Sequence, residues 1–297
     1  MGINGNREKV VRIGLPSGSL EEATMTLLEK AGYKFNRNGR SYYPLVDDDE
    51  LEVVMIRAQE IAGYVSKGIF DAGITGKDWI LENKADIVEI EELVYSKQSM
   101  RPVRWVVAVP DNSPIKILED LNGKRIATEL VNTTRSFLSG RKIVAEVEFS
   151  WGATEVKSPI LVDAIVEATE TGRSLKENNL RIIDTILIST PRLIANKESY
   201  LILWKKEKID QIAMLVKGAL NASGRVGLKF NLPQIQIQAA REVVTAMKDP
   251  TVSSLLDENW VALEIIILEK EVRAIIPKLK KIGARDIIEY PLNKVIY

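Results

Sequence analysis

Two carboxylates and a hydroxyl-rich glycine turn lie close together at 161–175, in the segment LVDAIVEATETGRSL. Asp163 and Glu167 belong to an apolar run typical of a buried strand, and a polar turn from Thr171 to Ser174 precedes a helix-like segment. Backbone N–H groups at such a turn bind anions, and carboxylates accept strong hydrogen bonds from hydroxyl groups. The combination suits a phosphorylated sugar. An ordinary strand, turn and capped helix gives the same pattern, and this window alone does not separate the two interpretations.

Three other turns of similar composition follow predicted strands. They are Pro16-Ser17-Gly18-Ser19, Ile74-Thr75-Gly76-Lys77 and Gly152-Ala153-Thr154-Glu155. In open α/β sheets, ligands bind beyond the carboxyl ends of strands, where helix N-termini converge. We therefore expect a cleft lined by groups that bind phosphates and hydroxyls. Arg57, at the end of a predicted strand, would add a fixed positive charge, although a surface arginine explains the pattern equally well.

The elements that must position these residues alternate along the first 190 residues. Strands are predicted at 10–15, 51–56, 70–74, 104–109, 125–128, 144–149 and 161–166, and helices at 20–31, 58–68 and from 79 onward. Ser19 is the predicted N-cap of the first helix. This alternation favours an α/β fold with mainly parallel sheet, in one or two lobes.

The last quarter of the chain has a different pattern. Strands are predicted at 225–232 and 260–268, with a strand-rich tail at 287–296 and helices at 234–247 and 269–284. Pro277 inside the second helix predicts a kink or a shortened helix. The order βαββαβ is that of a ferredoxin-like module.

Composition excludes several classes of chemistry. The chain has 297 residues, 41 basic and 41 acidic, with neither cysteine nor histidine. Disulfides, a Cys nucleophile, Ser-His-Asp catalysis and His-ligated zinc are therefore ruled out. The balanced charge predicts no binding to nucleic acid or to an anionic membrane. Because a signal-peptide pattern and a long apolar run are both missing, we expect a soluble cytoplasmic protein. Walker A and G-x-G-x-x-G motifs are also missing, and the five tryptophans are interpreted as packing residues.

Five blocks, in order, resemble one enzyme family. They are IGLPSGSLEEAT, RAQEIAGYVSKGIFDAGITGKDW, LNGKRIATE, SWGATEVKSPILVDAIVEATETGRSLKENNLR and WVALEIIILEKEVRAIIPKLKKIGARDIIEYPLNKVI. Together they are similar to the long, regulated form of ATP phosphoribosyltransferase, the first enzyme of histidine biosynthesis. The resemblance extends along almost the whole chain, and the order of the blocks makes a chance match improbable.

The resemblance implies a fold and a reaction. The fold is α/β, with a two-lobed catalytic body like the type II periplasmic binding proteins and a C-terminal ferredoxin-like (ACT-like) βαββαβ regulatory domain. The implied boundaries are 1–97 with 192–221 for lobe I, 98–191 for lobe II and 222–297 for the regulatory domain. The implied reaction transfers the phosphoribosyl group of phosphoribosyl pyrophosphate to N1 of the ATP purine and releases pyrophosphate. Mg²⁺ would arrive on the pyrophosphate, without a dedicated protein cage. Histidine feedback inhibition and assembly into dimers or hexamers are further family expectations.

The resemblance also implies residue roles. Glu155 would face the reacting ribose, and Asp163 and Glu167 would hold the ribose hydroxyls. The phosphoribosyl-binding residues would be Glu170, Thr171, Gly172, Arg173, Ser174 and Leu175, and those on the ATP side Ser17, Gly18, Arg57, Thr75 and Gly76. Because a purine nitrogen needs positioning more than a strong base, a chain without histidine is compatible with this chemistry.

One departure from the family leaves alternatives open. Relatives often carry Lys or Arg in the first turn, which here reads Pro-Ser-Gly-Ser, and Lys77 is a candidate to supply the charge. A non-catalytic two-lobed sensor of a nucleotide or an amino acid would show the same binding turns. A subunit kept only for assembly or regulation is a third possibility, which the presence of Asp163 and Glu167 disfavours.

Overall fold

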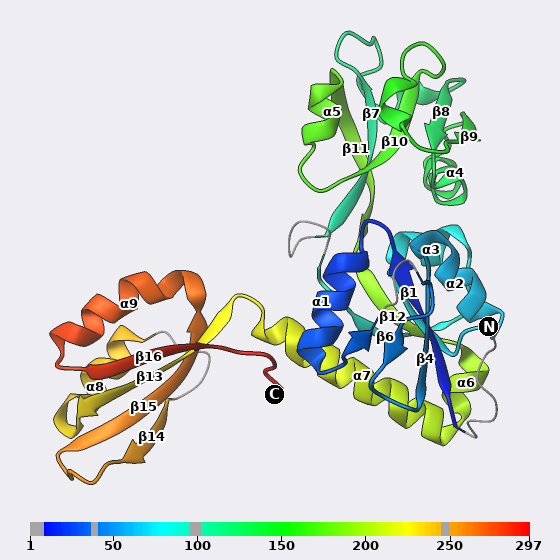
Figure 1. Cartoon of the computed structure of the whole chain (residues 1–297). Helices are drawn as coiled ribbons and strands as arrows, with labels where there is room; N and C mark the ends of the chain where they lie inside the picture. The colour runs from blue at the N-terminus through cyan, green and yellow to red at the C-terminus, as the bar shows by residue number, and fades with distance from the viewer. Residues whose placement is uncertain (1–8, 37–40, 96–101, 245–249) are drawn as a thin grey trace. The chain divides into compact units, whose positions relative to one another are not determined.

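The structure is a computed structural model that describes residues 9–36, 41–95, 102–244 and 250–297. The chain forms two compact units, Met1–Ala213 and Met214–Tyr297. The first unit contains two five-stranded sheets, which we call the first and second lobes, and the second unit contains a four-stranded sheet (Figure 1). Within the described ranges, no helix is long and apolar enough to cross a membrane.

The first lobe has the strand order β4-β1-β5-β12-β6. Its strands are β1 Val11–Ser17, β4 Leu51–Arg57, β5 Ala72–Gly76, β6 Val88–Glu92 and β12 Pro191–Ala195, beside a small ribbon of β2 Phe35–Asn36 and β3 Leu45–Val46. Its helices are α1 Glu21–Ala31, α2 Ala58–Ser66, α3 Lys77–Glu82 and α6 Lys197–Leu201, and α7 Leu203–Ala222 follows. α2 buries Ile61, Ala62 and Val65 in an apolar cluster with Phe70 and Ile194. This packing holds the start of α2, and hence Arg57, at the end of β4.

The second lobe has the strand order β11-β7-β10-β8-β9. Its elements are β7 Val103–Pro110, η1 Leu118–Leu121, β8 Arg125–Thr128, α4 Val131–Ser139, β9 Glu146–Phe149, η2 Thr154–Val156, β10 Ala164–Thr169, α5 Arg173–Glu177 and β11 Leu180–Ser189. Both lobes are mixed, so the expectation of mainly parallel sheet is wrong. β10 runs parallel to β8 but antiparallel to β7, and β12 runs antiparallel to β5 and β6. The antiparallel pairs arise where the chain passes from one lobe to the other and back.

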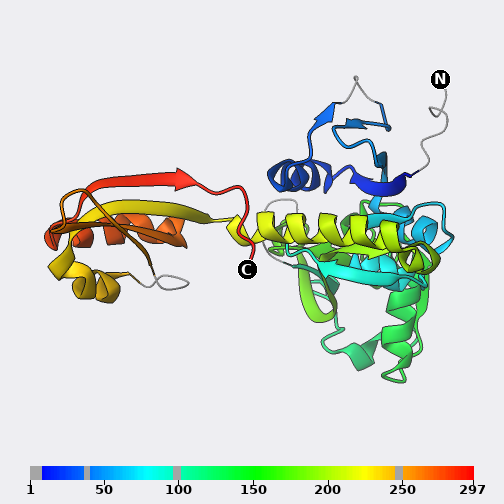
Figure 2. The ribbon, with the colours of Figure 1, turned by 90° about the horizontal axis from the view of Figure 1, so that it is seen from below.

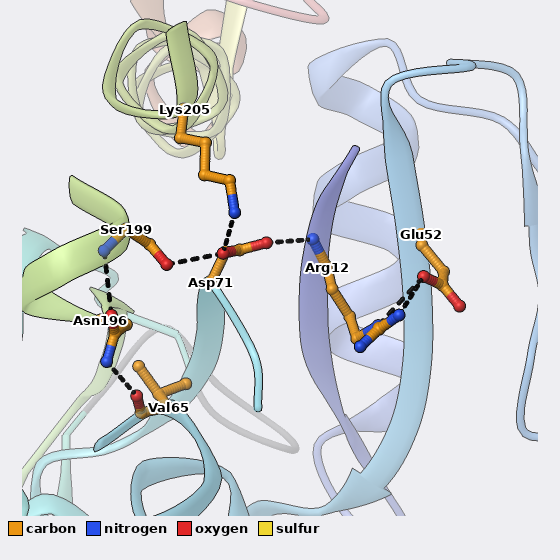
Figure 3. Close-up of polar contacts among 7 residues, drawn as sticks. All are labelled: Arg12, Glu52, Val65, Asp71, Asn196, Ser199 and Lys205. Atoms are coloured by element: carbon orange, nitrogen blue, oxygen red, sulfur yellow. Dashed lines mark hydrogen bonds and ion pairs between the residues drawn. The ribbon is translucent and has the colours of Figure 1, made fainter. Parts of the chain in front are cut away.

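A buried polar cluster fastens the α6–α7 segment to the first sheet (Figure 3). The Asp71 carboxylate accepts hydrogen bonds from the Arg12 backbone N–H at 2.9 Å, the Ser199 hydroxyl at 2.6 Å and Lys205 Nζ at 2.6 Å. Asn196 caps α6 by accepting from the Ser199 N–H. Because each donor comes from a different element, Asp71 joins β1, α6 and α7 at one point.

The second unit is an antiparallel sheet of order β14-β15-β13-β16. Its elements are β13 Arg225–Pro233, η3 Gln234–Gln236, α8 Ile237–Val243, β14 Thr251–Ser254, β15 Trp260–Leu268, α9 Glu269–Lys281 and β16 Arg285–Pro291. Both helices pack on one face, where Phe230, Leu263, Val272, Ile275 and Leu279 share an apolar core (Figure 2). The ferredoxin-like prediction is confirmed, and β14 is the strand for which the sequence offered no clear segment. The last predicted helical residues, 245–247, lie outside the described ranges.

Several local predictions differ from the structure. α9 continues four residues past Pro277, so the predicted shortening is wrong. Ser19 is not the cap of α1, because Leu20 takes the N-cap position and no side chain caps the helix there. Thr75 and Gly76 are the end of β5 rather than a turn, since β5 pairs there with β12. The predicted end of the first helix at residue 31 is correct, and Gly32, which follows it, has φ +107°.

Candidate active site

A pocket of about 680 Å³ lies where elements of the two lobes meet. Its lining includes seven of the residues singled out from the sequence: Ser17, Arg57, Glu167, Glu170, Thr171, Arg173 and Ser174. Residues to which the sequence assigned no binding or catalytic role also line it, among them Ser19, Leu20, Ala58, Gln59, Asp78, Trp79, Val103, Trp105, Glu129, Ala168, Thr169 and Glu177. The four turns predicted to share a cleft are therefore unequal: the first and last contribute lining residues, and the other two stand behind the lining.

One wall is the turn between β10 and α5. Gly172 is the N-cap of α5 with φ +79°, a conformation that few residues other than glycine adopt, and its N–H donates to Thr169 Oγ1 at 2.7 Å. The Arg173 N–H points to Thr171 Oγ1 at 3.4 Å. Leu175 is fully buried and anchors the turn in the apolar core of the lobe. The turn thus brings Thr171, Arg173 and Ser174 to the pocket on a fixed base, while the Gly172 and Arg173 N–H groups are bonded within the turn.

Carboxylates stand beside this turn. Ser174 Oγ donates to Glu155 Oε1 at 2.6 Å, so Glu155 contacts the turn although it does not line the pocket. Glu167 Oε1 accepts from the Ala168 N–H at 2.9 Å, and the Thr154 hydroxyl also donates to this carboxylate. Burial raises the pKa of Glu167, and the nearby Glu155 and Glu129 carboxylates add to the rise.

Glu129 is a lining residue that sequence reasoning missed. It directly follows β8, at the carboxyl end of a strand parallel to β10. The rule that ligands bind beyond the carboxyl ends of strands would have found it.

Asp163 is not brought to the pocket. Its Oδ2 accepts from the Arg125 N–H at 2.9 Å, and its own N–H donates to the Arg125 carbonyl. Arg125 begins β8, and Asp163 immediately precedes β10, so this acid lies at the start of the strand. Glu167 lies four residues further on, toward the turn. The two acids share a face by strand parity but are about 13 Å apart along the strand.

The opposite wall comes from the first lobe. Gly18, with φ +89°, leaves room for Arg57, because a Cβ on Gly18 would lie 2.8 Å from Arg57 Nη1. The guanidinium therefore lies against the Ser17-Gly18 backbone and supplies the positive charge that this turn lacks. Lys77, the residue expected to supply it, is instead paired with Glu89 and does not line the pocket.

Thr75 and Gly76 stand behind this wall rather than in the lining. Thr75 is fully buried, and its hydroxyl donates to the Ala58 carbonyl at 2.6 Å, which fixes the first turn of α2 next to Arg57. A Cβ on Gly76 would lie 2.0 Å from Asp78 Oδ1, so a glycine is required for the Asp78 carboxylate to fold back over the chain.

Two tryptophans line the pocket. Trp79 and Trp105 meet edge to face, with ring centroids 6.0 Å apart. The interpretation of the tryptophans as packing residues is incomplete, since these two both pack and line the pocket. Burial raises the pKa of Asp78, although hydrogen bonds from Trp105, Trp79 and Ser189 oppose the rise.

The fold and the pocket define a class of protein: a two-lobed α/β body followed by a ferredoxin-like unit. Residues 57–218 match the family described as ATP phosphoribosyltransferase, and residues 222–294 match the HisG C-terminal domain. The chain belongs to the ATP phosphoribosyltransferase family.

Relatives named ATP phosphoribosyltransferase match nearly the whole chain. The Chlorobium phaeovibrioides protein is 57% identical over 291 residues, covering 98% of this chain and 99% of the relative. The Thermodesulfovibrio yellowstonii protein is 54% identical over 290 residues, covering 98% and 99%. A solved structure, the ATP phosphoribosyl transferase (HisG:HisZ) complex from Thermotoga maritima, matches 70% of this chain and 99% of that chain, with 29% identity and a TM-score of 0.60. The resemblance read from the five sequence blocks is thereby confirmed.

Proposed function

We propose that this protein transfers the phosphoribosyl group of phosphoribosyl pyrophosphate to N1 of the ATP purine, giving phosphoribosyl-ATP and pyrophosphate, the first step of histidine biosynthesis. The observation that carries the proposal is the pairing of two unlike walls in one pocket. One wall has hydroxyls and carboxylates around Gly172, and the other has Arg57 over the Ser17-Gly18 backbone. The hydroxyls and carboxylates of the first wall suit a sugar phosphate. The Arg57 guanidinium of the second wall suits a triphosphate.

The phosphoribosyl group would lie against the β10–α5 turn. Thr171, Arg173 and Ser174 would hold the 5′-phosphate, with Gly172 shaping the turn, Glu170 at its edge and Leu175 as its buried anchor. Glu167 would accept hydrogen bonds from the ribose hydroxyls, and Glu155 would face the same ribose through its contact with Ser174. We leave Asp163 out of this set, because its carboxylate is bonded at the far end of β10.

ATP would lie on the first-lobe wall. Arg57, Ser17 and the Gly18 backbone would bind its phosphates, with Thr75 and Gly76 holding that wall from behind. Leu20, Ala58 and Trp79 supply apolar surface suited to the face of a purine.

The reaction then needs alignment more than acid–base chemistry. N1 of the purine attacks the anomeric carbon, the N–C bond forms, and pyrophosphate leaves with the electron pair of the broken C–O bond. Positive charge develops on the ribose during this displacement, and the Glu167 and Glu155 carboxylates stabilise it electrostatically. Holding the two substrates on facing walls converts a bimolecular encounter into an oriented one.

Mg²⁺ would be bound mainly through the pyrophosphate of the substrate. Among the residues that the structure describes, no three potential ligands converge on one point. Mg²⁺ typically uses one or two carboxylates together with substrate phosphates, and Glu129 and Glu167 are the lining carboxylates that fit this pattern. When bound, the ion neutralises charge on the leaving pyrophosphate.

The remaining assignments follow the family. We propose lobe I at 1–97 with 192–221, lobe II at 98–191 and a regulatory domain at 222–297. Histidine as a feedback inhibitor acting on that domain, a homodimer or homohexamer, and a cytoplasmic location complete the proposal.

Incubation of the folded protein with ATP, phosphoribosyl pyrophosphate and Mg²⁺ tests the function. We expect release of pyrophosphate and one phosphoribosyl-ATP adduct by mass spectrometry. A Glu167→Gln/Thr171→Ala double variant should fold normally and lose turnover. Tight binding of a single nucleotide or amino acid without any adduct would instead support the non-catalytic sensor.

A further inference from the structure

The short helix α3 belongs to the first lobe by its chain position, yet its acidic side chains bond to the second lobe. Asp78 and Glu82 are four residues apart, which places both carboxylates on one face of the helix. The contacts of these two residues are independent of each other and are made with different elements.

Asp78 bonds to the two strands next to the points where the chain enters and leaves the second lobe. Its Oδ2 accepts from Trp105 Nε1 at 2.7 Å, near the start of β7. Its backbone N–H donates to Ser189 Oγ at 3.1 Å, at the end of β11, and the Lys77 N–H donates to the Thr190 carbonyl. β7 and β11 are paired neighbours, so one residue of the first lobe joins both strands at their base.

Glu82 caps a helix of the second lobe. Its two carboxylate oxygens accept from the N–H groups of Asn132 at 2.8 Å and Thr133 at 2.9 Å, in the first turn of α4. The Asn132 amide returns a bond to the Glu82 carbonyl at 3.1 Å. Leu130, at the N-cap position of α4, makes no side-chain cap. Two of the N–H groups that a helix start leaves without an intrahelical partner thus bond to a carboxylate from the other lobe, whose charge also interacts favourably with the helix dipole.

We propose that Asp78 and Glu82 form an interlobe clasp, and that they are positioning residues that fix the separation of the ATP wall and the phosphoribosyl wall. This inference rests on the proposed function, since it assumes that the two substrates occupy opposite walls. Displacement of reacting groups by about 1 Å costs roughly 100-fold in rate. A clasp that holds two walls therefore acts on turnover rather than on the binding of either substrate to its own wall.

The test uses the absence of cysteine from the chain, which makes introduced labels unique. Cysteines replacing Glu60 on α2 and Glu119 on η1, both exposed, place one spin label on each lobe. Distance distributions are then measured by double electron–electron resonance in the full chain carrying Glu82→Ala, Trp105→Phe or both. Trp105→Phe removes the donor to Asp78 while keeping an aromatic ring.

We expect broader distance distributions in both single variants and a larger effect in the double variant. In Glu82→Ala, whose residue does not line the pocket, the kcat should fall about 10- to 100-fold, while the Kd values of ATP alone and of phosphoribosyl pyrophosphate alone stay within about twofold. Asp86→Asn is the matched control, because this exposed acid pairs with Lys197 inside the first lobe and should change neither quantity.

Unchanged distance distributions in the double variant would overturn the clasp, whatever the activity. A parallel loss of binding at either wall in Glu82→Ala would overturn the positioning role and assign this residue to local structure. If the unaltered protein makes no adduct, the proposed function fails, and the distance measurement still decides whether the clasp exists.

Discussion

Ser174 Oγ lies 2.6 Å from Glu155 Oε1 and donates a hydrogen bond to it, although 19 residues separate the two in sequence. The bond ties the β10–α5 turn to η2 on the same lobe. A phosphate bound at the turn would compete with Glu155 for the hydrogen bond that the Ser174 hydroxyl donates. If the hydroxyl donates to the phosphate, its bond to Glu155 is lost. Occupation of the turn would therefore release the Glu155 carboxylate, which we propose faces the ribose.

Replacing Ser174 by alanine should weaken phosphoribosyl pyrophosphate specifically. A hydrogen bond to a charged group contributes about 1.5–3 kcal/mol, so we expect the KM of this substrate to rise about tenfold or more, with the KM of ATP nearly unchanged. Steady-state kinetics with each substrate varied in turn measures both. Ser136→Ala, an exposed serine on α4, is the matched control. An equal rise in both KM values would argue against a phosphate at this turn.

Glu167 should impose an acid limb on the pH–rate profile. Because burial raises its pKa above the ordinary value of 4.5, protonation begins at a higher pH than for an exposed glutamate, and activity falls as the pH is lowered through that pKa. Glu167→Gln should lower kcat/KM at every pH and remove this limb. Glu146→Gln, on the edge strand β9, should retain it. Persistence of the limb in Glu167→Gln would assign it to another group.

The same pKa shift predicts the opposite effect on stability. The folded state binds the Glu167 proton more tightly than the unfolded state, so the free energy of unfolding falls as the pH rises from the unfolded pKa through the folded one. Above both values the cost of burying the charge is complete. Glu167→Gln should therefore be more stable than the parent at neutral pH and lose this advantage in acid, which urea unfolding at several pH values would reveal. A variant less stable at neutral pH would contradict the assigned cause of the shift.

Trp79 should matter for ATP and not for the other substrate. Stacking of a base on an aromatic ring contributes about 1–3 kcal/mol, so Trp79→Leu should raise the Kd of ATP about fivefold or more, measured by calorimetry. Binding of phosphoribosyl pyrophosphate should stay within about twofold. Trp151→Phe is the control, since Trp151 is exposed and outside the pocket lining. Equal affinity for ATP in Trp79→Leu would move the purine away from this wall.

The sequence predicted elements well where local signals and tertiary contacts agree. The strands at 125–128 and 260–268 occur with the predicted bounds, because apolar runs with clear flanks pair along their whole length. The strand predicted at 70–74 is displaced to Ala72–Gly76 because Gly76 pairs with Pro191, a contact with a distant strand that no local pattern contains. The turn-forming residues Thr75 and Gly76 therefore do not prevent this strand from pairing with β12.

The candidate site shows a second limit of sequence reasoning. Asp163 and Glu167 have the same strand parity and the same charge, and the sequence assigned them one role. The bounds of β10 place Asp163 just before the strand, and the parallel pairing with β8 brings it to Arg125 at the start of that strand. Arg57 was identified, but its placement over Gly18 depends on β1 and β4 lying side by side, with Ser17 opposite Arg57.

Separating Asp71 from Lys205 should be costly to the first unit. Their side chains are only 11% and 19% exposed, and their oxygen and nitrogen atoms are 2.6 Å apart (Figure 3). In Asp71→Asn the new amide N–H group would face one of the three donors, and Lys205 would lose the carboxylate with which it pairs. Breaking a buried pair in this way costs about 3 kcal/mol or more.

Lys205→Met should cost less, because Asp71 would keep the bonds from Arg12 and Ser199. Urea unfolding followed by circular dichroism measures the order, with Lys197→Met, in an exposed pair, as a near-neutral control. Equal losses in Asp71→Asn and Lys205→Met would mean that the ion pair alone, and not the three-donor cluster, holds α6 and α7 to the sheet.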